Sequence, residues 1–230
     1  MVVLWWFCCT QSNRRIRQEK PLNILQDWNK WWSATEQERP EYDLSNTDNW
    51  RVAAAKSRSP EDKDWWYTNG YKFYENWIKW RKLNPHLSIA LLNDGTQAIE
   101  LEMAPVVKGV TIKMAIDRVF YDSSTEEYLI VDLKTGKNMP QSHLQLEMYA
   151  FGLRNQFGLH VTRGHYWMAR KGELSSKFDL AGLTDSKVET LVDMFDRARK
   201  SGIFLPNFDH CNMCGYSALC EWYTPKEKDE

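Results

Sequence analysis

The sequence predicts an α/β fold, in which helices surround one mixed sheet, and two observations support that prediction. Residues 96–133 hold several β-rich apolar runs, and helical and strand-like patterns alternate after them. The chain has 230 residues, 43% of them hydrophobic and 13% aromatic, which is enough for a substantial core. We therefore expect one domain over residues 1–230, with a mainly helical part at 1–95, a sheet and a helix at 96–182, and a helix and tail at 183–230.

Two expected strands at the centre of the chain each present an acidic residue near their end. The first has apolar residues at alternate positions and turns Asp117 to the opposite face; these residues are Val110, Ile112, Met114 and Ile116. The second, at residues 128–133, leads into Asp132-Leu133-Lys134. Asp132 and Lys134 share a face because side chains in a strand repeat every second residue. Residues 96–107 precede the pair as a further strand. Glu100 and Glu102 either lie at the edge of the site or, as we expect, are exposed.

Two carboxylates and a lysine at neighbouring strands suit the metal-assisted hydrolysis of a phosphodiester. Asp117 and Asp132 offer the oxygen ligands that Mg²⁺ and Mn²⁺ prefer. Such a metal lowers the pKa of a bound water and stabilises charge on phosphorus. Lys134 would then orient the water or neutralise the charge of the transition state. An isolated Asp and Lys more often form a surface ion pair, so the prediction depends on the whole set in this order.

Helical patterns lie on both sides of this region. Pro140 and Ser142 start a helix whose apolar side is marked by Leu144, Met148 and Phe151. Gln145 and Tyr149 are four residues apart and therefore lie on one face of that helix. An amphipathic helix is predicted from residue 64 to just before Pro85, and another from residue 184 or 185 to Gly202. Residues 165–169 read as a buried strand that pairs with 175–180 across a turn.

Tryptophan is frequent in the first 80 residues. Aromatic faces stack on unpaired bases in some DNA-binding proteins, but most tryptophans pack in a core, and we expect the core role here. The net charge of −1 gives no general basic coat for nucleic acid, although a groove can be locally basic. No apolar run reaches the length of a membrane span, so a cytoplasmic protein without a membrane partner is expected.

The order of these residues resembles the PD-(D/E)xK nucleases of the RecB/Cas4-like branch, over roughly residues 60–223. The matching residues are Asp117, the pair Asp132-x-Lys134, and Gln145-x-x-x-Tyr149. The resemblance implies a restriction-endonuclease-like core, catalytic roles for these five residues, and Asp117 and Asp132 as ligands of Mg²⁺ or Mn²⁺. It further implies a phage-type exonuclease acting on single-stranded DNA or DNA ends, with a helicase or recombination protein as a candidate partner. The alternatives are a catalytically weakened DNA-binding module, or a subunit active only within a helicase or CRISPR-adaptation-like complex.

One position departs from the resembled family. The family usually carries a glycine followed four residues later by a metal-binding histidine, and here Gly70 is followed by Tyr74. Glu75 then becomes a candidate ligand from the same helix. Otherwise the metal depends on Asp117 and Asp132 alone.

Three of the five cysteines lie close together near the C-terminus, with the spacing C-x2-C-x5-C; they are Cys211, Cys214 and Cys220. Three thiolates form three-quarters of a tetrahedral zinc site or of an iron–sulfur site, and a fourth ligand is needed. The resemblance implies a structural [4Fe-4S] cluster that joins the two ends of the chain, with Cys9, or else Cys8, as the fourth ligand. Structural Zn²⁺, completed by His210 or an N-terminal cysteine, is the alternative.

Overall fold

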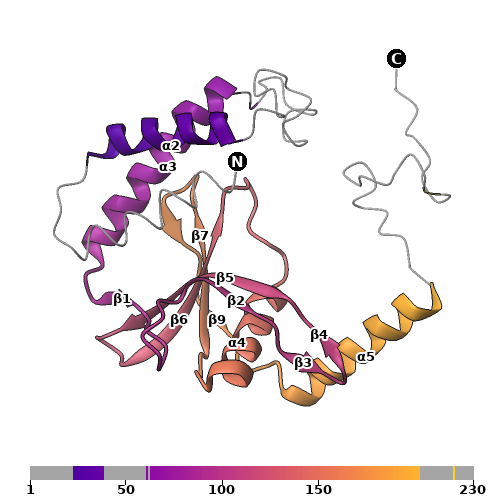
Figure 1. Ribbon diagram of the computed structural model, residues 1–230. Helices are drawn as coiled ribbons and strands as arrows, with labels where there is room; N and C mark the ends of the chain where they lie inside the picture. The colour runs from indigo at the N-terminus through magenta and orange to yellow at the C-terminus, as the bar shows by residue number, and fades with distance from the viewer. Residues whose placement is uncertain (1–22, 39–60, 62, 203–219, 221–230) are drawn as a thin grey trace.

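The computed structural model describes residues 23–38, 61, 63–202 and 220. A seven-stranded sheet lies at its centre, with helices on both faces (Figure 1). The strand order is β1-β5-β6-β7-β8, with β2 also paired to β5 and β9 to β7, and a two-stranded sheet of β3 and β4 lies beside it. The elements in chain order are α2 (Ile24–Glu38), α3 (Lys63–Leu83), β1 (Leu87–Ile89), β2 (Ile99–Met103), β3 (Val106–Val107), β4 (Val110–Thr111), β5 (Met114–Asp122), β6 (Glu127–Lys134), α4 (Leu144–Phe157), β7 (Arg163–Met168), β8 (Glu173–Leu174), β9 (Phe178–Asp179) and α5 (Asp185–Ser201).

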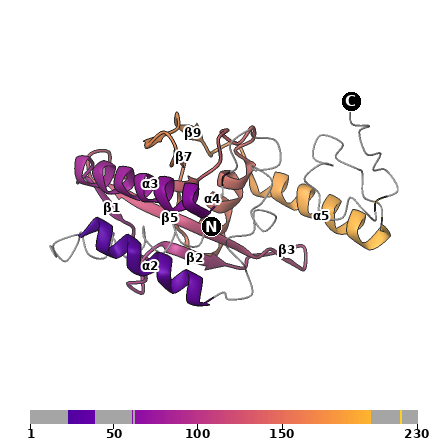
Figure 2. The same ribbon diagram turned by 90° about the horizontal axis from the view of Figure 1, so that it is seen from above.

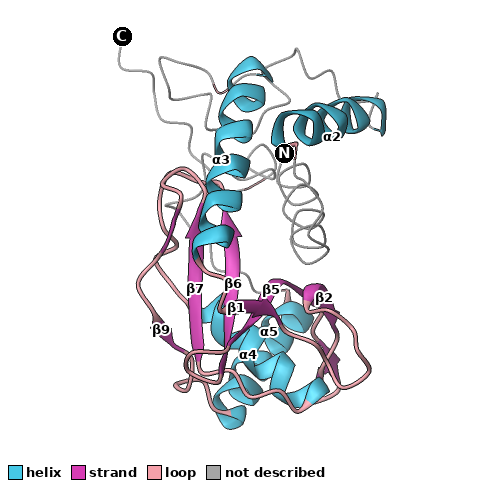
Figure 3. Ribbon diagram, turned by 90° about the vertical axis from the view of Figure 1, so that its left-hand side faces the viewer, coloured by secondary structure: helices cyan, strands magenta, loops and turns pink. Residues whose placement is uncertain are grey.

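The sheet is mixed, as predicted. Strands β5 and β6 form an antiparallel hairpin, whereas β7 runs parallel to β6 after the crossover through α4. Strand β6 is largely buried, because α3 covers one of its faces and α4 the other (Figure 3). Its residues Leu129, Val131 and Leu133 pack toward α3, and Ile130 packs toward α4. Asp132 and Lys134 alternate with the first set, so they lie on the α4 side of the sheet.

Helices α2 and α3 form an aromatic layer at one side of the molecule, with α5 at the other (Figure 2). Trp28, Trp31, Trp32 and Trp77 are all buried in this layer, so these tryptophans have the predicted core role. Helix α3 covers the predicted span and ends before Pro85. A Cβ on Gly70 would lie 2.6 Å from Cη2 of Trp28, so this glycine lets the two helices approach closely.

Helix α4 differs in detail from its prediction. It begins at Leu144 with His143 as the N-cap, and Leu144 itself is exposed. The face that packs on the sheet is instead Leu146, Tyr149, Ala150 and Leu153. Met148 and Phe151 contact a separate cluster formed with β3 and α5. The predicted apolar side was therefore wrong at Leu144, because the helix is buried on two sides and a single stripe does not describe it.

The first of the two central strands also differs from the prediction. The run expected to be one strand from residue 110 is divided between β4 and β5, with Ile112 and Lys113 outside both. Strand β5 continues to Asp122, because Val119 and Phe120 bury opposite faces of it. Asp117 consequently lies in the middle of β5 and not near its end.

The C-terminal helix follows its prediction. Thr184 is the N-cap of α5 and accepts a hydrogen bond from the backbone N–H of Lys187, while Gly202 adopts the left-handed conformation at the C-cap. Within the part of the chain that the structure describes, no helix is both long enough and apolar enough to cross a membrane.

Candidate active site

Acidic residues from three adjacent strands lie at one level of the sheet. Ile99 of β2 pairs with Arg118 of β5, which pairs with Val131 of β6. Counting one residue on along each antiparallel strand places Glu100, Asp117 and Asp132 in a row across β2, β5 and β6. The parallel register continues this row to Tyr166 of β7.

The backbone pairing changes at this row. The β5–β6 ladder stops at Arg118 and Val131, and Oδ2 of Asp117 accepts a hydrogen bond of 2.7 Å from the backbone N–H of Leu133. The Asp117 carboxylate thus takes the place of a backbone acceptor on the neighbouring strand. It is fixed by the strand that carries Asp132, so the separation of the two carboxylates depends on the sheet itself.

Glu100 and Arg118 form the other side of the row. Glu100 has a φ of +47°, a left-handed conformation that costs a non-glycine residue about 1 kcal/mol or more. Arg118 is fully buried; its Nη1 lies 3.3 Å from Oε1 of Glu100 and also donates to the backbone carbonyl of Asp117. The unusual backbone of Glu100 therefore accompanies a contact that links β2 to the acidic row.

A continuous set of polar contacts joins β6 to α4. Nζ of Lys134 lies 2.7 Å from Oδ2 of Asp132 and donates to Oε1 of Gln145 at 3.0 Å. Gln145 in turn donates through Nε2 to the hydroxyl of Tyr149 at 2.8 Å. The Lys134 ammonium also lies 5.5 Å from the ring centre of Tyr166. The structure therefore brings together Asp117, Asp132, Lys134, Gln145 and Tyr149.

Burial and crowding raise the carboxyl pKa values in the row. The pKa of Asp132 is raised to about 6, first by burial and then by the charge of Asp117, against the opposing effect of Lys134. Burial also raises the pKa of Asp117, which the Leu133 N–H and Arg118 partly offset. The pKa of Glu100 is raised to about 7 by burial and by Asp117. Strong upward shifts of clustered acids are typical of functional sites, and here they persist although Arg118 and Lys134 partly offset the charge of the row.

Comparison with known proteins shows the family to which the chain belongs. The profile described as the PD-(D/E)XK nuclease superfamily matches residues 23–221. The chain belongs to the PD-(D/E)XK nuclease superfamily. A solved structure, that of SSO0001, is similar with a TM-score of 0.44 and 13% identity over 84% of this chain and 82% of that chain. No curated protein matches the sequence.

Membership of the PD-(D/E)XK superfamily implies a metal-dependent nuclease with a nucleic-acid substrate. One carboxylate oxygen of the site is suited to bind a cation. Oδ2 of Asp132 is buried and accepts no aligned hydrogen bond, although Lys134 approaches it as an ion pair. Asp117 lies beside it with the same oxygen chemistry. Across the described residues, no three His, Cys, Asp or Glu side chains converge as a ligand group. Two carboxylates, completed by water and phosphate oxygens, match the habit of Mg²⁺.

The helix expected to contribute a ligand packs differently. Tyr74 is fully buried, and its ring meets Trp31 edge-on at 5.4 Å between centroids. Glu75 forms an ion pair of 3.6 Å with Lys79 on the same helix. Among the described residues, no contact joins Glu75 to the acidic row.

Of the cysteine ligands predicted from the sequence, only Cys220 lies within the described part, as a half-buried free thiol. Cys8, Cys9, Cys211 and Cys214, like His210, lie outside the described residues.

Glu100 is the site residue that sequence reasoning valued too little. Alternation within β2 groups it with the exposed Glu102, and Glu102 is indeed exposed. The left-handed conformation of Glu100 breaks that alternation and leaves the residue half-buried beside Asp117. Arg118 did leave a signal, since it lies in a run with the apolar residues Ile116, Val119 and Phe120, and those three are all buried.

Proposed function

We propose that this protein is a Mg²⁺- or Mn²⁺-dependent deoxyribonuclease that acts as an exonuclease on single-stranded DNA or DNA ends. The observation that carries the proposal is the linked set running from Asp132 through Lys134 and Gln145 to Tyr149, with Asp117 beside it. A carboxylate pair next to a held ammonium suits attack on a phosphodiester, because both the nucleophile and the developing phosphate charge need stabilisation.

Each residue has a role that follows from its contacts. Asp117 and Asp132 would hold the divalent cation, which supplies an activated water and charge stabilisation when bound. Lys134 has an ammonium within reach of both Asp132 and Gln145, so it is held where a phosphate oxygen or a water would lie. Gln145 fixes that ammonium from α4, and its own amide is oriented by the Tyr149 hydroxyl. This support reduces the motion of Lys134 before any substrate arrives.

The decisive experiment uses the purified full chain with Mg²⁺ or Mn²⁺, linear DNA labelled at either the 5′ or the 3′ end, and circular DNA labelled internally. Single-stranded, blunt duplex and covalently closed circular substrates are compared. Release of short labelled products from linear but not circular DNA supports the exonuclease proposal, and cleavage of circles indicates an endonuclease. The proposal is wrong if the wild-type chain and Asp132→Asn give the same digestion.

A second candidate is a DNA-binding module that has kept the fold but lost most catalytic power. The observation that favours it is Tyr74, which occupies the aromatic core in place of the histidine of the resembled family. Metal-independent DNA binding without cleavage would support this candidate. Cleavage that appears only after adding a helicase or recombination protein would instead indicate a subunit that needs its partner.

We also propose that Cys220, with Cys211, Cys214 and Cys9 or Cys8, binds a structural [4Fe-4S] cluster. The spacing of the thiols supports this, and the half-buried free thiol of Cys220 suits a ligand. Iron and acid-labile sulfide in an anaerobic preparation would distinguish the cluster from Zn²⁺, which brings neither. Stoichiometric zinc without sulfide would refute the cluster.

A further inference from the structure

A buried ion pair lies beside the chain that leaves the strand carrying Asp132 and Lys134. Glu61, only 3% exposed, accepts two hydrogen bonds from Arg170, at 3.1 Å from Nη1 and 2.9 Å from Nη2. Lys137 adds a second cation 3.4 Å from the same carboxylate. Glu61 precedes α3, and Arg170 follows β7, so the pair joins the helical layer to the sheet.

Arg170 uses its third guanidinium nitrogen on the chain that follows Lys134. Its Nε donates to the backbone carbonyl of Thr135 at 2.7 Å. The preceding residue, Ala169, donates its N–H to the carbonyl of Lys134 at 2.9 Å. Two successive residues after β7 therefore hold two successive carbonyls at the end of β6, and the second of these bonds depends on a side chain.

The surroundings fix the guanidinium itself. It lies over the rings of Trp65, Trp66 and Phe73 at 4.8, 5.6 and 5.8 Å from their centroids. A planar cation held by aromatic faces and a bidentate carboxylate has little freedom to turn. The position of the Thr135 carbonyl thus depends on the aromatic layer of α3 through Arg170.

Assuming the nuclease function proposed above, we propose that Glu61 and Arg170 are positioning residues, which together form a latch that sets the direction of the chain leaving Lys134. The segment from Thr135 to His143 joins β6 to α4, so it connects Lys134 to the helix that carries Gln145. Stability alone does not explain the latch, because a buried ion pair often stabilises no more than an apolar group of equal size. The β6–β7 pairing already extends to Lys134 and Met168 without it.

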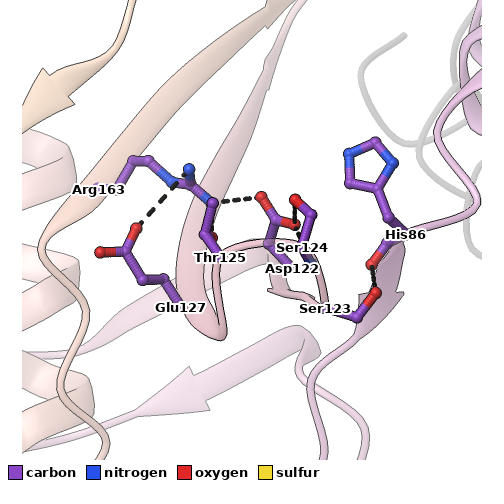
Figure 4. Close-up of polar contacts among 7 residues, drawn as sticks. All are labelled: His86, Asp122, Ser123, Ser124, Thr125, Glu127 and Arg163. Atoms are coloured by element: carbon purple, nitrogen blue, oxygen red, sulfur yellow. Dashed lines mark hydrogen bonds and ion pairs between the residues drawn. The ribbon is translucent and has the colours of Figure 1, made fainter.

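The same strand supplies a matched control at its other end. Arg163 begins β7 and donates to Oδ2 of Asp122 at 2.8 Å, and this pair is as buried as the latch (Figure 4). It joins β7 to the turn between β5 and β6, away from the acidic row. Arg163→Lys therefore disturbs a comparable ion pair without touching the chain next to Lys134.

Arg170→Lys keeps the charge but cannot make the bidentate bond and the Thr135 bond together. We expect it to lower kcat about 10- to 100-fold with KM for the DNA unchanged, since a small displacement of reacting groups has effects of that size. Glu61→Gln keeps the shape of the acceptor and should lower kcat by a smaller factor. Arg163→Lys should leave kcat near the wild-type value. All measurements are made well below the melting temperature of each variant, so that a lower kcat reflects displaced groups and not a loss of folded protein.

Amide exchange gives a readout that does not need activity. The peptide containing residues 135–138 should exchange faster in Arg170→Lys than in the wild type, and not in Arg163→Lys. Equal kcat in the two lysine variants, or unchanged exchange in Arg170→Lys, overturns the latch. An inactive wild-type chain refutes the nuclease proposal alone, and the exchange result then decides the latch.

Discussion

The two ends of the central sheet hold buried carboxylates in opposite ways. At the hairpin end, Oδ1 of Asp122 accepts from the N–H and hydroxyl of Ser124, and Oδ2 accepts from Arg163 (Figure 4). These bonds lower the pKa of Asp122. At the site end, burial and the charge of Asp117 raise the pKa of Asp132 to about 6, against the opposing effect of Lys134. The difference teaches that Asp122 serves the fold, whereas the pKa of Asp132 stays raised even beside Lys134, as suits a carboxylate that awaits a cation.

The largest expected difference between the two ends is catalytic. Asp132→Asn should lower kcat about 10²- to 10³-fold, because it removes charge that stabilises the transition state. Asp122→Asn should leave kcat within a small factor of the wild type, since its contacts among the described residues, with Ser124 and Arg163, do not reach the acidic row. Steady-state digestion of end-labelled DNA at saturating Mg²⁺ measures both. A comparable loss of kcat in the two variants would show that the two ends of the sheet do not differ in their role in catalysis.

A smaller catalytic effect is expected where α4 supports the site. Gln145→Leu removes the acceptor that holds Lys134 and the donor to Tyr149, but leaves Asp132 and Lys134 in contact. We expect kcat to fall about 10-fold, in line with the loss of one hydrogen bond to a charged group. Glu147→Gln is a control on the same helix. An unchanged kcat in Gln145→Leu would show that the Asp132 contact alone holds Lys134.

The regular side-chain repeats of strands and helices explain why the spatial grouping of several candidate residues could be predicted. Asp132 and Lys134 share a face because a strand repeats every two residues, and Gln145 and Tyr149 share one because a helix repeats every 3.6 residues. Each pair lies within one element, and the loop that joins β6 to α4 is short. Asp117 was predicted near the end of its strand but lies within β5, because strand length depends on pairing with β1 and β2.

The other contacts around the site cannot be predicted from local sequence patterns. Glu61 and Arg170 are 109 residues apart, and their pairing depends on how α3 crosses the sheet. Glu100 adopts a left-handed backbone that no residue type in its run signals, since glutamate rarely favours it. Sequence periodicity therefore predicted which side chains of the proposed site lie together, while tertiary packing decides which further residues contact them.

The stability of the metal-free protein should change with pH in opposite senses at the two ends. Asp122 has a lowered pKa, so its contribution is present above the unfolded value near 3.8 and is lost as pH falls. Asp132 has a raised pKa, so its contribution is present below 3.8 and is lost as pH rises through about 6. At pH 8 Asp122→Asn should therefore destabilise the protein, and Asp132→Asn should stabilise it by about 1–3 kcal/mol.

Urea unfolding in EDTA at pH 8 and pH 5 measures both variants. The stabilisation by Asp132→Asn should shrink at pH 5, where the native carboxyl is already mostly protonated. A variant less stable than the wild type at pH 8 would mean that the ion pair with Lys134 outweighs burial, and the contrast between the two ends would then be lost.

The smallest expected effect concerns the cation itself. If Mg²⁺ binds the native Asp117 and Asp132 but not the unfolded chain, it stabilises by mass action, by about 2.7 kcal/mol at a concentration 100 times its Kd. Weak sites give less, so at millimolar Mg²⁺ we expect a rise in melting temperature of a few degrees, about 2–4 °C per kcal/mol for a chain of this size. Asp132→Asn should abolish the rise, whereas Asp122→Asn should keep it, because the hairpin carboxylate already has its hydrogen bonds. The opposite result is loss of the Mg²⁺ effect in Asp122→Asn with its retention in Asp132→Asn. It would indicate that the cation binds at the hairpin end, and it would refute Asp117 and Asp132 as the ligands.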